Sequence, residues 1–539
     1  MKKIFTFVLF TFLFLSGLSI KTAATEAYNI NTNPGPDLAT TIHINYHSDI
    51  TGTFVDYTKA DDPTYANKVT VFGTERLFSK PENESGYLSN GFAERYVVTV
   101  ELTDLEPNTK YIYRVGKTVF SKNYSFQTAT TSDTFTFLHI TDPQFSSSAT
   151  ILNNLLNTAY TKNPDIAFTF LTGDVVDRGG IESQWTTLYL TNNISKGIIA
   201  VGPGNHEYYD ASPSPQHYNN SYFNAFYNNP KNGAETILNS SYYFRYNDEL
   251  FIMLDTETKE FTAQKNWFEK IMNENIDARY TVVGMHRSFY GSIYASDSIT
   301  VRSHWQALFD RYGVDLVLSG HDHVYARSKH IYSNAISTDL IKGTTYIIGG
   351  SGGAKFYAAV PNDKYAKVIE LTSVANLITI SPTAISTELI DQSGNTLDTA
   401  TIARKRVGTV LDTFDKSAFL ETMNVIVDPN DSVGGIVQWD TNAYGNVGSV
   451  RVLNKQYQYV ISQTFMYHPS FTELKFSGIY PDRVNSFTIE VNFADQTKSL
   501  FDVEFDTRPP VVNKTILEVL DMIYTQFHTA FEKILEPNQ

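Results

Sequence analysis

Between residues 134 and 349, short apolar runs alternate with stretches of helical periodicity, and this alternation constrains the fold most strongly. The run "TFTFLHIT" is followed by "ATILNNLLNTAYTKN", in which Ile151, Leu155 and Ala159 recur at helical spacing. Runs such as "DIAFTFLTG" and "KGIIAVGPG" are apolar without alternation, which is typical of strands buried on both faces. The region is therefore predicted to form a largely parallel or mixed sheet with helices outside it.

Polar side chains stand where these predicted strands end. The turn formed by Gly202, Pro203 and Gly204 ends one strand directly before Asn205 and His206. Because the carboxyl ends of the strands share one rim of such a sheet, we expect the polar side chains to meet there. The metal-capable residues expected at this rim are Asp142, Gln144, Asp174, Asn205, His286, His321 and His323.

This cluster predicts a metal site. Carboxylates and imidazoles gathered in a crevice without partners would be costly to desolvate, and a pair of cations would satisfy them. A mixed carboxylate and imidazole ligand set suits Zn, Fe or Mn better than Ca or Mg. We therefore expect two divalent or trivalent transition-metal ions as cofactors.

Composition excludes other chemistries. The chain has no cysteine among its 539 residues, so disulfides, thiolate ligands and a cysteine nucleophile are all excluded. Its formal net charge of −15 disfavours nucleic acid as a partner and offers no global attraction for phosphates. A bound phosphate would need a local source of positive charge, and the expected metal ions supply one.

The motifs "DPQ", "GDVVDRG", "GNHE", "MH" and "GHDH" resemble, in this order and at these spacings, the five motifs of the calcineurin-like metallophosphoesterase superfamily. The resemblance covers about residues 134–400. The all-β segment before it resembles the N-terminal domain of purple acid phosphatases, and "GHDHVYARS" is similar to their last motif. The family implies an α/β domain of the αββα type with a dinuclear metal site.

The resemblance also implies the role of each site residue. Asp142, Asp174 and His323 would hold the first metal, with Gln144 in or near its shell. Asp174 would bridge to the second metal, because one carboxylate can share two ions about 3.5–4 Å apart. The residues that complete the second site would be Asn205, His286 and His321.

Three further residues take catalytic roles by the same resemblance. His206 would protonate the leaving alkoxide as general acid after a hydroxide attacks phosphorus in line. Asp177 would orient His206, and Arg178 would touch phosphate, although a surface salt bridge explains Asp177 and Arg178 equally well. His139 lies inside a strand, and alternation predicts that it points away from Asp142.

Two positions depart from the family pattern. Many members have histidine where this chain has Gln144, whose neutral carbonyl is a weaker metal ligand. Purple acid phosphatases have tyrosine where this chain has Asp177, so the charge-transfer colour of an iron–tyrosinate pair is not expected. The chain is therefore interpreted as a relative of the purple enzymes that is not itself purple.

The predicted architecture is multidomain: an all-β sandwich, the α/β (αββα-type) domain, a C-terminal β-rich domain and a terminal helix. The segment containing Leu105, Pro107, Thr109 and Tyr111 resembles the tyrosine corner of fibronectin type III domains, and we expect this sandwich to act as a rigid spacer. The predicted boundaries are residues 25–130 for the fibronectin III-like domain, 131–402 for the metallophosphoesterase domain, 403–510 for the β-rich domain and 511–539 for an amphipathic helix.

The N-terminus indicates export. Lys2 and Lys3 precede an apolar run of 17 residues and then "KTAATEA", which predicts a signal peptide over residues 1–24. The alternative is an uncleaved membrane anchor, because such a run nearly spans a bilayer. We expect a secreted or cell-surface bacterial protein whose membrane contact, if any, is made by this segment or by the C-terminal helix.

The function predicted from these features is hydrolysis of phosphate monoesters by a secreted, acid-phosphatase-like metallophosphoesterase. The runner-up is a phosphodiesterase or nucleotidase, for which the aromatic insertion at residues 208–249 would stack on a base or aryl group. A non-enzymatic alternative is a surface binding protein that keeps a phosphoesterase fold. The expected partner is a small phosphate ester rather than a nucleic acid scaffold.

Overall fold

The computed structural model describes residues 26–79, 93–190, 194–210, 220–339, 342–405, 414–428, 430–431, 433–440, 446–465, 472–495, 497–508, 521 and 523–525. The chain divides into two compact units, residues 1–406 and 407–539. The predicted signal peptide at residues 1–24 and nearly all of the predicted C-terminal helix at residues 511–539 lie outside the described residues.

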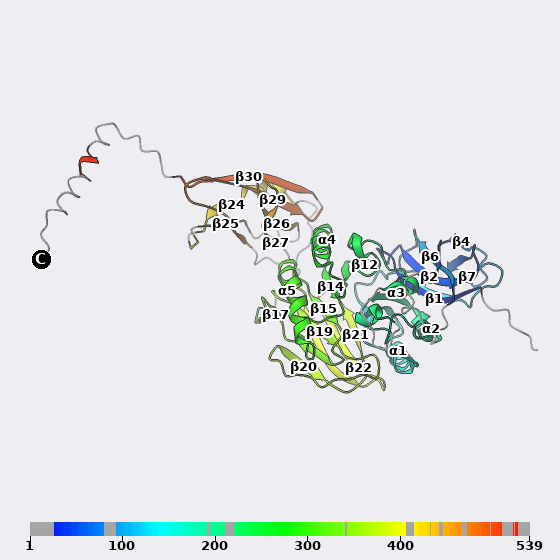
Figure 1. Ribbon diagram of the computed structural model, residues 1–539. Coiled ribbons are helices and arrows are strands. Elements are labelled where there is room, and N and C mark those ends of the chain that lie inside the picture. Colours follow the sequence, from blue (N-terminus) through cyan, green and yellow to red (C-terminus); the bar gives the residue numbers. More distant parts are fainter. Residues whose placement is uncertain are drawn as a thin grey trace, which may run out of the picture. The chain divides into compact units, whose positions relative to one another are not determined.

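The first unit begins with an all-β domain (Figure 1). One of its layers is a four-stranded sheet in the order β4-β3-β7-β8, and the other contains β1, β2, β6 and β5. Inward-facing residues of both layers, among them Tyr46, Val55 and Val115, are fully buried in one apolar cluster. The strands are β1 (Ala27–Pro34), β2 (Ile42–Ser48), β3 (Phe54–Lys59), β4 (Val69–Phe72), β5 (Thr74–Phe78), β6 (Arg95–Leu102), β7 (Lys110–Gly116) and β8 (Tyr124–Gln127).

A tyrosine stabilises the turn before β7. The backbone amide of Glu106 donates a hydrogen bond to the hydroxyl of Tyr111, at 3.0 Å. Tyr111 is buried, and its ring stacks on Phe126 with centroids 5.3 Å apart. This contact has the form of the tyrosine corner expected from the sequence.

The all-β domain shares a sheet with the α/β region. β1 pairs in parallel with β11 (Ile198–Gly202) at Thr32 and Ile198, which joins the strands into one ten-stranded sheet. Asn33 Nδ2 donates to the carbonyl of Ile199 at 2.9 Å, and Asn45 Nδ2 donates to that of Ala225 at 3.0 Å. The domain therefore shares the sheet of the α/β region, a feature that the expectation of a spacer did not include.

Two packed sheets form the α/β region of the first unit, and one of them includes strands of the all-β domain. The ten-stranded sheet runs β23-β22-β21-β9-β10-β11-β1-β2-β6-β5, and a seven-stranded sheet runs β12-β13-β14-β15-β19-β16-β20. The strands are β9 (Phe135–Ile140), β10 (Ile166–Thr172), β12 (Tyr242–Tyr246), β13 (Glu249–Met253), β14 (Tyr280–Gly284), β15 (Leu316–Ser319), β16 (Tyr325–Ser328), β19 (Thr345–Gly349), β20 (Tyr365–Ile369), β21 (Val374–Ile380), β22 (Ala384–Asp391) and β23 (Thr396–Ala403), with β17 (Ile331–Tyr332) and β18 (Ala335–Ile336) forming a separate small hairpin.

Aromatic side chains hold the two sheets together. Phe168 of β10 meets Phe251 of β13 edge to face at 5.0 Å, and Phe137 of β9 meets the same ring at 5.3 Å. Such contacts stabilise an interface by about 0.5–1.5 kcal/mol each beyond area burial. The core between the sheets thus contains a group of buried phenylalanine rings in contact with one another, within a larger apolar cluster.

Helices cover the outer faces of both sheets (Figure 1). Apolar side chains such as Leu155 of α1 and Trp185 of α2 are buried in a cluster with strands of the ten-stranded sheet. On the other side, Phe268 of α4 packs against Trp305 of α5 at 5.8 Å. The helices are α1 (Thr150–Lys162), α2 (Glu182–Leu190), α3 (Ser221–Phe226), α4 (Phe261–Glu274) and α5 (Ala295–Tyr312), with short η1 (Ile194–Lys196), η2 (Asn205–Tyr208) and η3 (Glu235–Ile237). The predicted αββα arrangement is confirmed.

The second unit is rich in β-structure, as predicted. A three-stranded sheet β24-β25-β28 and a four-stranded sheet β27-β26-β29-β30 share one apolar cluster, in which Phe476 meets Phe487 at 5.0 Å. Its elements are α6 (Lys416–Glu421), β24 (Asn424–Val427), β25 (Gly434–Gln438), β26 (Val447–Asn454), β27 (Val460–Phe465), β28 (Glu473–Ser477), β29 (Val484–Phe493) and β30 (Lys498–Asp506).

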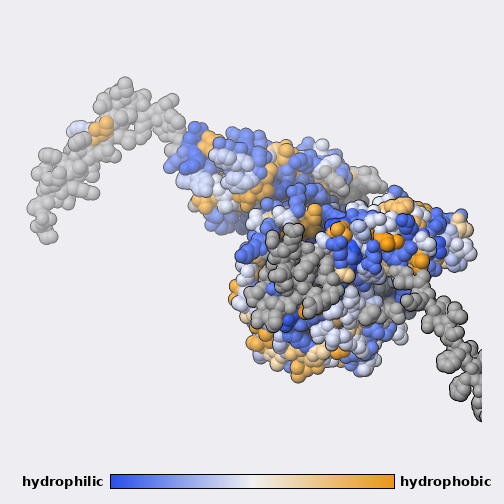
Figure 2. Space-filling model, turned by 45° about the vertical axis from the view of Figure 1, so that its right-hand side comes forward, coloured by the Kyte–Doolittle hydropathy of each residue, from blue (hydrophilic) through white to orange (hydrophobic). Residues whose placement is uncertain are grey.

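The face drawn in Figure 2 is mostly hydrophilic, with hydrophobic residues in small groups among polar ones. Among the described residues, no helix combines the length and the apolar character needed to cross a membrane.

Candidate metal centre

The site is built from loops that follow the strands of both sheets. Asp142 lies after β9 and Asp174 after β10, and both side chains are buried. Their loops pair through the backbone, because the amide of Asp142 donates to the carbonyl of Gly173 at 3.1 Å and that of Gln144 donates to the carbonyl of Asp174 at 2.8 Å. The two carboxylates are thereby fixed next to each other.

Glycines allow the loops to approach one another. A Cβ atom on Gly204 would lie 2.2 Å from Asp174 Oδ1, and a Cβ atom on Gly320 would lie 2.2 Å from Asp142 Oδ2. Both distances are far below van der Waals contact, so the positions require glycine. The glycine-rich turn before Asn205 therefore serves to bring the backbone against a candidate ligand.

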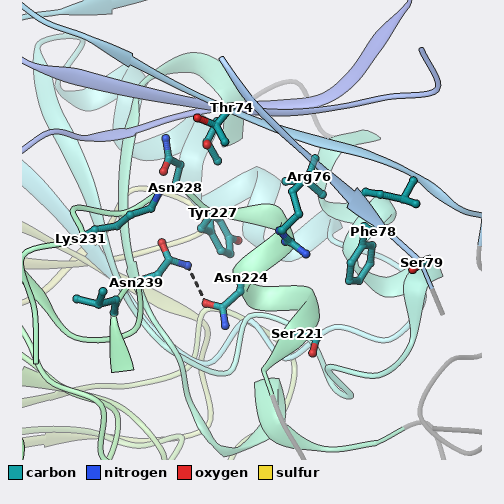
Figure 3. A pocket seen from close by; sticks show the side chains of 14 residues that line it. Thr74, Arg76, Phe78, Ser79, Ser221, Asn224, Tyr227, Asn228, Lys231 and Asn239 are labelled. Carbon is teal, nitrogen blue, oxygen red and sulfur yellow. Dashed lines mark hydrogen bonds between the residues drawn. The ribbon is translucent and has the colours of Figure 1, made fainter. Parts of the chain in front are cut away.

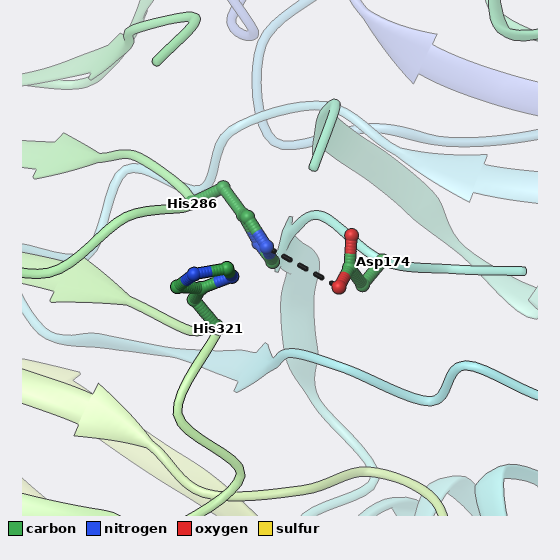
Figure 4. Close-up of side chains that lie close together, drawn as sticks. All are labelled: Asp174, His286 and His321. Carbon is green, nitrogen blue, oxygen red and sulfur yellow. Dashed lines mark ion pairs between the residues drawn. The ribbon is translucent and has the colours of Figure 1, made fainter. Parts of the chain in front are cut away.

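Two groups of three side chains have ligand atoms within 4.8 Å of one another, and they share Asp174. The first group contains Asp142, Asp174 and His323. The second contains Asp174, His286 and His321, and Figure 4 shows the histidines facing the carboxylate from the loops after β14 and β15. The structure thus brings together five of the residues predicted as metal ligands, with Asp174 in the shared position.

Hydrogen bonds fix the tautomers of two of these histidines. His286 Nδ1 lies 2.9 Å from the carbonyl of Thr172, and His323 Nδ1 lies 3.1 Å from the carbonyl of Lys355. Because a carbonyl oxygen can only accept, each Nδ1 carries a hydrogen, and Nε2 is the nitrogen that can bind a metal once it carries no proton. The Nε2 atoms point at carboxylates, His286 at Asp174 (3.3 Å) and His323 at Asp142 (3.5 Å). A hydrogen bond from Nδ1 to a carbonyl, with Nε2 directed into the site, is typical of metal-binding imidazoles.

The electrostatics of the site favour a positive charge at its centre. Burial lowers the pKa of His286, but the carboxylates of Asp174 and Asp142 outweigh it and raise the pKa to about 10. Burial raises the pKa of Asp142 to about 7. Burial also raises the pKa of Asp174, yet His286 and His206 bring it below its ordinary value. Asp142 and Asp174 stabilise a positive charge on the imidazole of His286, and the same negative field would attract a metal ion.

The donor set fits two transition-metal ions. Asn205 Oδ1 lies 3.1 Å from His286 Nε2, so the amide oxygen faces the second group as the sequence predicts. Gln144 is placed differently: its Oε1 accepts a hydrogen bond from Lys355 Nζ at 3.2 Å, and its amide nitrogen lies 2.9 Å from His206 Nε2. Its side chain is thus engaged with Lys355 and His206 in the described structure.

His206 lies beside both ligand groups, and hydrogen bonds fix the orientation of its ring. Its Nδ1 donates to the backbone carbonyl of Asp177 at 2.5 Å, and its backbone amide donates to Asp174 Oδ1 at 2.9 Å. The Nε2 atom lies 3.8 Å from Asp174 Oδ2 and is the nitrogen directed toward the metal groups. The carboxylate of Asp177 is 3.8 Å from Nδ1, so the carbonyl of Asp177 makes the closer contact. Arg178 Nε lies 3.9 Å from that carboxylate.

Sequence reasoning missed Glu207, which connects the turn after β11 to the loop after β10. Its buried carboxylate accepts from the amides of Asp174 and Gly204, at 2.8 and 2.7 Å, and from that of Val175 at 2.8 Å. The residue follows His206 directly in "GNHE". Its burial among backbone N–H donors identifies its role, and this environment cannot be read from the sequence. It is a positioning residue for the loops that carry Asp174 and Asn205.

Three tyrosine rings pack against histidines of the site. Tyr209 packs on His206 with ring centroids 4.8 Å apart, Tyr294 on His321 at 4.3 Å, and Tyr357 on His323 at 5.4 Å. The hydroxyl of Tyr294 donates to that of Tyr357 at 3.2 Å. All three tyrosines are half-buried, so they form an aromatic border around the metal groups.

A separate cavity of about 530 Å³ lies elsewhere in the first unit (Figure 3). It is lined by residues of β5 and β6 and of the segment around α3, including Arg76 and Lys231. Asn239 Nδ2 donates to Asn224 Oδ1 at 2.9 Å across one side of it. None of the predicted site residues lines this cavity, so it is distinct from the candidate metal centre.

Comparisons with known proteins agree with the resemblance of the motifs. Residues 135–325 match the calcineurin-like phosphoesterase family, and residues 27–128 match the purple acid phosphatase N-terminal domain. The structure is similar to that of a purple acid phosphatase from yellow lupin seeds, with a TM-score of 0.59 and 18% identity over 70% of this chain and 75% of that one. At this identity the likeness shows the fold.

Two of the curated relatives are proteins of Arabidopsis thaliana. Purple acid phosphatase 21 of Arabidopsis thaliana is 27% identical over 47% of this chain and 57% of its own length. A protein named probable inactive purple acid phosphatase 1, also from Arabidopsis thaliana, is 24% identical over 53% of this chain and 52% of its own length. The chain thus spans about half the length of these curated relatives.

Proposed function

We propose that this chain is a secreted, dinuclear metallophosphoesterase acting on phosphate monoesters, because residues 135–325 match the calcineurin-like phosphoesterase family and residues 27–128 match the purple acid phosphatase N-terminal domain. The observation that carries the proposal is the pair of ligand groups that share Asp174. One carboxylate common to two groups is the arrangement that an in-line displacement at phosphorus uses.

Asp142, Asp174 and His323 would hold one ion, and Asp174, Asn205, His286 and His321 the other. When bound, the two ions supply Lewis-acid activation of the phosphoryl group and of the attacking water. Fe, Zn and Mn are the candidates that suit this ligand set.

His206 is the proposed proton donor to the leaving group. Water attacks phosphorus, releases one proton to the solvent and forms a new P–O bond as the bond to the alcohol oxygen breaks, and the departing oxygen needs a proton. His206 Nε2 faces the metal groups while Nδ1–H is held by the carbonyl of Asp177. In the described structure Nε2 accepts from the amide of Gln144, so delivery of a proton from Nε2 to the leaving oxygen requires a protonated imidazole that has exchanged this partner for the substrate.

The aromatic border supports a second candidate, a phosphodiesterase or nucleotidase. Tyr209, Tyr294 and Tyr357 present half-buried rings beside the site, and such rings can stack on a nucleobase or an aryl group. The monoesterase remains the first proposal because it needs only the metal groups and His206.

A metal analysis combined with a substrate panel tests the proposal. The purified protein should contain about two transition-metal ions per chain, and it should hydrolyse p-nitrophenyl phosphate faster than bis-p-nitrophenyl phosphate. Preference for the diester would favour the second candidate. Two bound metals with no hydrolysis of either ester would instead support a surface binding protein, in line with a relative that is named inactive.

A further inference from the structure

We propose that the ammonium group of Lys355 binds a non-bridging oxygen of the substrate's phosphoryl group, a proposal that rests on the phosphoesterase activity proposed above. Lys355 belongs to the loop between β19 and β20, outside the five motifs. Its Nζ lies 3.2 Å from Gln144 Oε1, and its main-chain oxygen accepts the hydrogen bond of His323 Nδ1.

The start of this loop is anchored to the loop that carries Asp142. The amide of Gly352 donates to the carbonyl of Thr141 at 2.7 Å, and Ser351 Oγ donates to that of Asp142 at 3.3 Å. A Cβ atom on Gly353 would lie 2.0 Å from the carbonyl oxygen of Pro143, so the two loops are in close contact. Lys355 is therefore held at a defined position next to the first ligand group.

The charge of Lys355 is not compensated by a carboxylate within ion-pair distance in the part of the chain that the structure describes. Its contacts are the neutral amide of Gln144 and the ring of Tyr357, whose centroid is 5.5 Å from Nζ. Arg287, another cation beside the site, is paired with Glu257 at 2.7 Å and with Asp297. Lys355 thus keeps a positive charge that a substrate can use.

A phosphate ester supplies the missing partner. A phosphoryl group carries a charge of about −1.5 to −2 near neutral pH, and this chain has a formal net charge of −15. An ammonium–phosphate hydrogen bond is charge-assisted and stronger than the bond to a neutral amide that it would replace. Because the partner of Gln144 Nε2 is His206, the ammonium group also stands on the same side of the site as the proposed proton donor.

A purely structural role for Lys355 makes a different prediction. The ammonium group could serve only to orient the amide of Gln144 against His206. In that case its loss would disturb proton transfer and lower kcat, whereas the affinity of the protein for phosphate would stay the same. Measuring phosphate binding separately from turnover therefore distinguishes a binding residue from a positioning residue.

The test compares Lys355→Met with Lys364→Met in the metal-loaded full chain. Lys364 lies in the same loop and also approaches a tyrosine ring, that of Tyr290 at 5.9 Å. Its backbone hydrogen bonds join it to Asn362 and Lys329, which are not predicted site residues. Binding of inorganic phosphate is measured by calorimetry, and kcat and KM with p-nitrophenyl phosphate. In Lys355→Met the phosphate Kd and the KM should both rise roughly 10- to 100-fold with little change in kcat. Lys364→Met should match the wild type, and Lys355→Arg should recover part of the affinity.

Metal content and far-UV circular dichroism check that each variant is folded and loaded. Unchanged phosphate affinity in a loaded Lys355→Met protein overturns the proposal, whether or not kcat falls, and leaves the phosphoesterase function standing. A wild-type protein that holds two metals yet neither binds phosphate nor hydrolyses the esters overturns the proposed function, and the role of Lys355 with it.

Discussion

Candidate ligands at the site adopt a backbone conformation that most residues avoid. Asp142, Asp174, His321 and His323 have φ angles of 50, 49, 73 and 49°, in the left-handed region. Asp and His tolerate this region better than most residues, but each such residue still costs about 1–3 kcal/mol. Strain concentrated on the ligands indicates that the loops are shaped for the site rather than for local stability.

The shared position of Asp174 leads to a prediction about metal stoichiometry. Because Asp174 belongs to both ligand groups and His321 to one, Asp174→Asn should reduce the content of both metals, whereas His321→Ala should lose mainly one. Elemental analysis after gel filtration measures the two contents. Equal metal loss in the two variants would contradict the bridging role of Asp174.

The placement of His206 predicts a dependence on the leaving group. His206→Asn should slow hydrolysis of an alkyl phosphate roughly 10²–10⁴-fold, because the alkoxide needs a proton as it departs. The loss should be much smaller for p-nitrophenyl phosphate, whose phenolate leaves without help. Equal losses on both substrates with normal metal content would point to phosphate binding by His206 instead of proton transfer.

At the scale of the strands, buried histidines make the ten-stranded sheet sensitive to acid. His47 of β2 is fully buried, its Nε2 donates to the carbonyl of Ala225 at 2.9 Å, and its Nδ1 accepts from Arg95 Nε at 2.9 Å. Burial, together with the charge of Arg95, lowers the pKa of His47 from 6.5 to about 3. The folded state therefore binds this proton less readily than the unfolded state does.

The sign of the pH effect follows from that difference. Stability from His47 is complete above pH 6.5 and is lost as the pH falls toward 3, with a slope of up to ~1.4 kcal/mol per pH unit. Urea unfolding of the metal-free protein at pH 7.5 and 5.0 should thus show a larger loss of stability than the same pair of measurements on His47→Gln. An identical loss in the variant would mean that His47 is not the group responsible.

Local patterns predicted most of the elements and the ligand set, whereas the contacts between distant segments could not be predicted. Asp142, Asn205 and His286 were recognisable because each follows a strand within a short motif. Glu207 and Lys355 could not be recognised in this way, because their roles depend on partners that are distant in the chain. Glu207 accepts from the amide of Val175, and Lys355 donates to the side-chain oxygen of Gln144. The shared sheet was missed for the same reason, because one parallel pairing of β1 with β11 creates it.

On the scale of the whole molecule, both ligand groups and His206 lie in the first unit. A chain that ends after residue 406 should therefore keep the metal content, kcat and KM of the full-length protein. Loss of metal in a folded truncated chain would show that the second unit contributes to the site.

The place of the cut matters because of Lys405. Its buried ammonium group lies 3.6 Å from Asp315 Oδ1 and donates to the carbonyl of Val314 at 2.7 Å. A chain that ends after Arg404 leaves Asp315 buried without this cation, which should cost about 3–5 kcal/mol of stability. Thermal unfolding of the two truncated chains, which differ by two residues at their ends, measures the effect. Similar unfolding temperatures would exclude this role for Lys405.

Pairing between strands that are far apart in the chain, such as β1 with β11 and β9 with β21, limits the order in which the first unit can fold. β1 comes from the start of the described chain, while β9, near the middle of the same sheet, is flanked by β10 on one side and by β21 on the other. As the chain leaves the ribosome, β9 presents an open apolar edge until β21 has been made. Such non-local pairing is intrinsically slow and leaves partly folded chains prone to aggregation. Refolding from denaturant is therefore expected to take milliseconds to seconds or longer and to give lower yields as protein concentration rises, because open edges on neighbouring chains compete for the same strand.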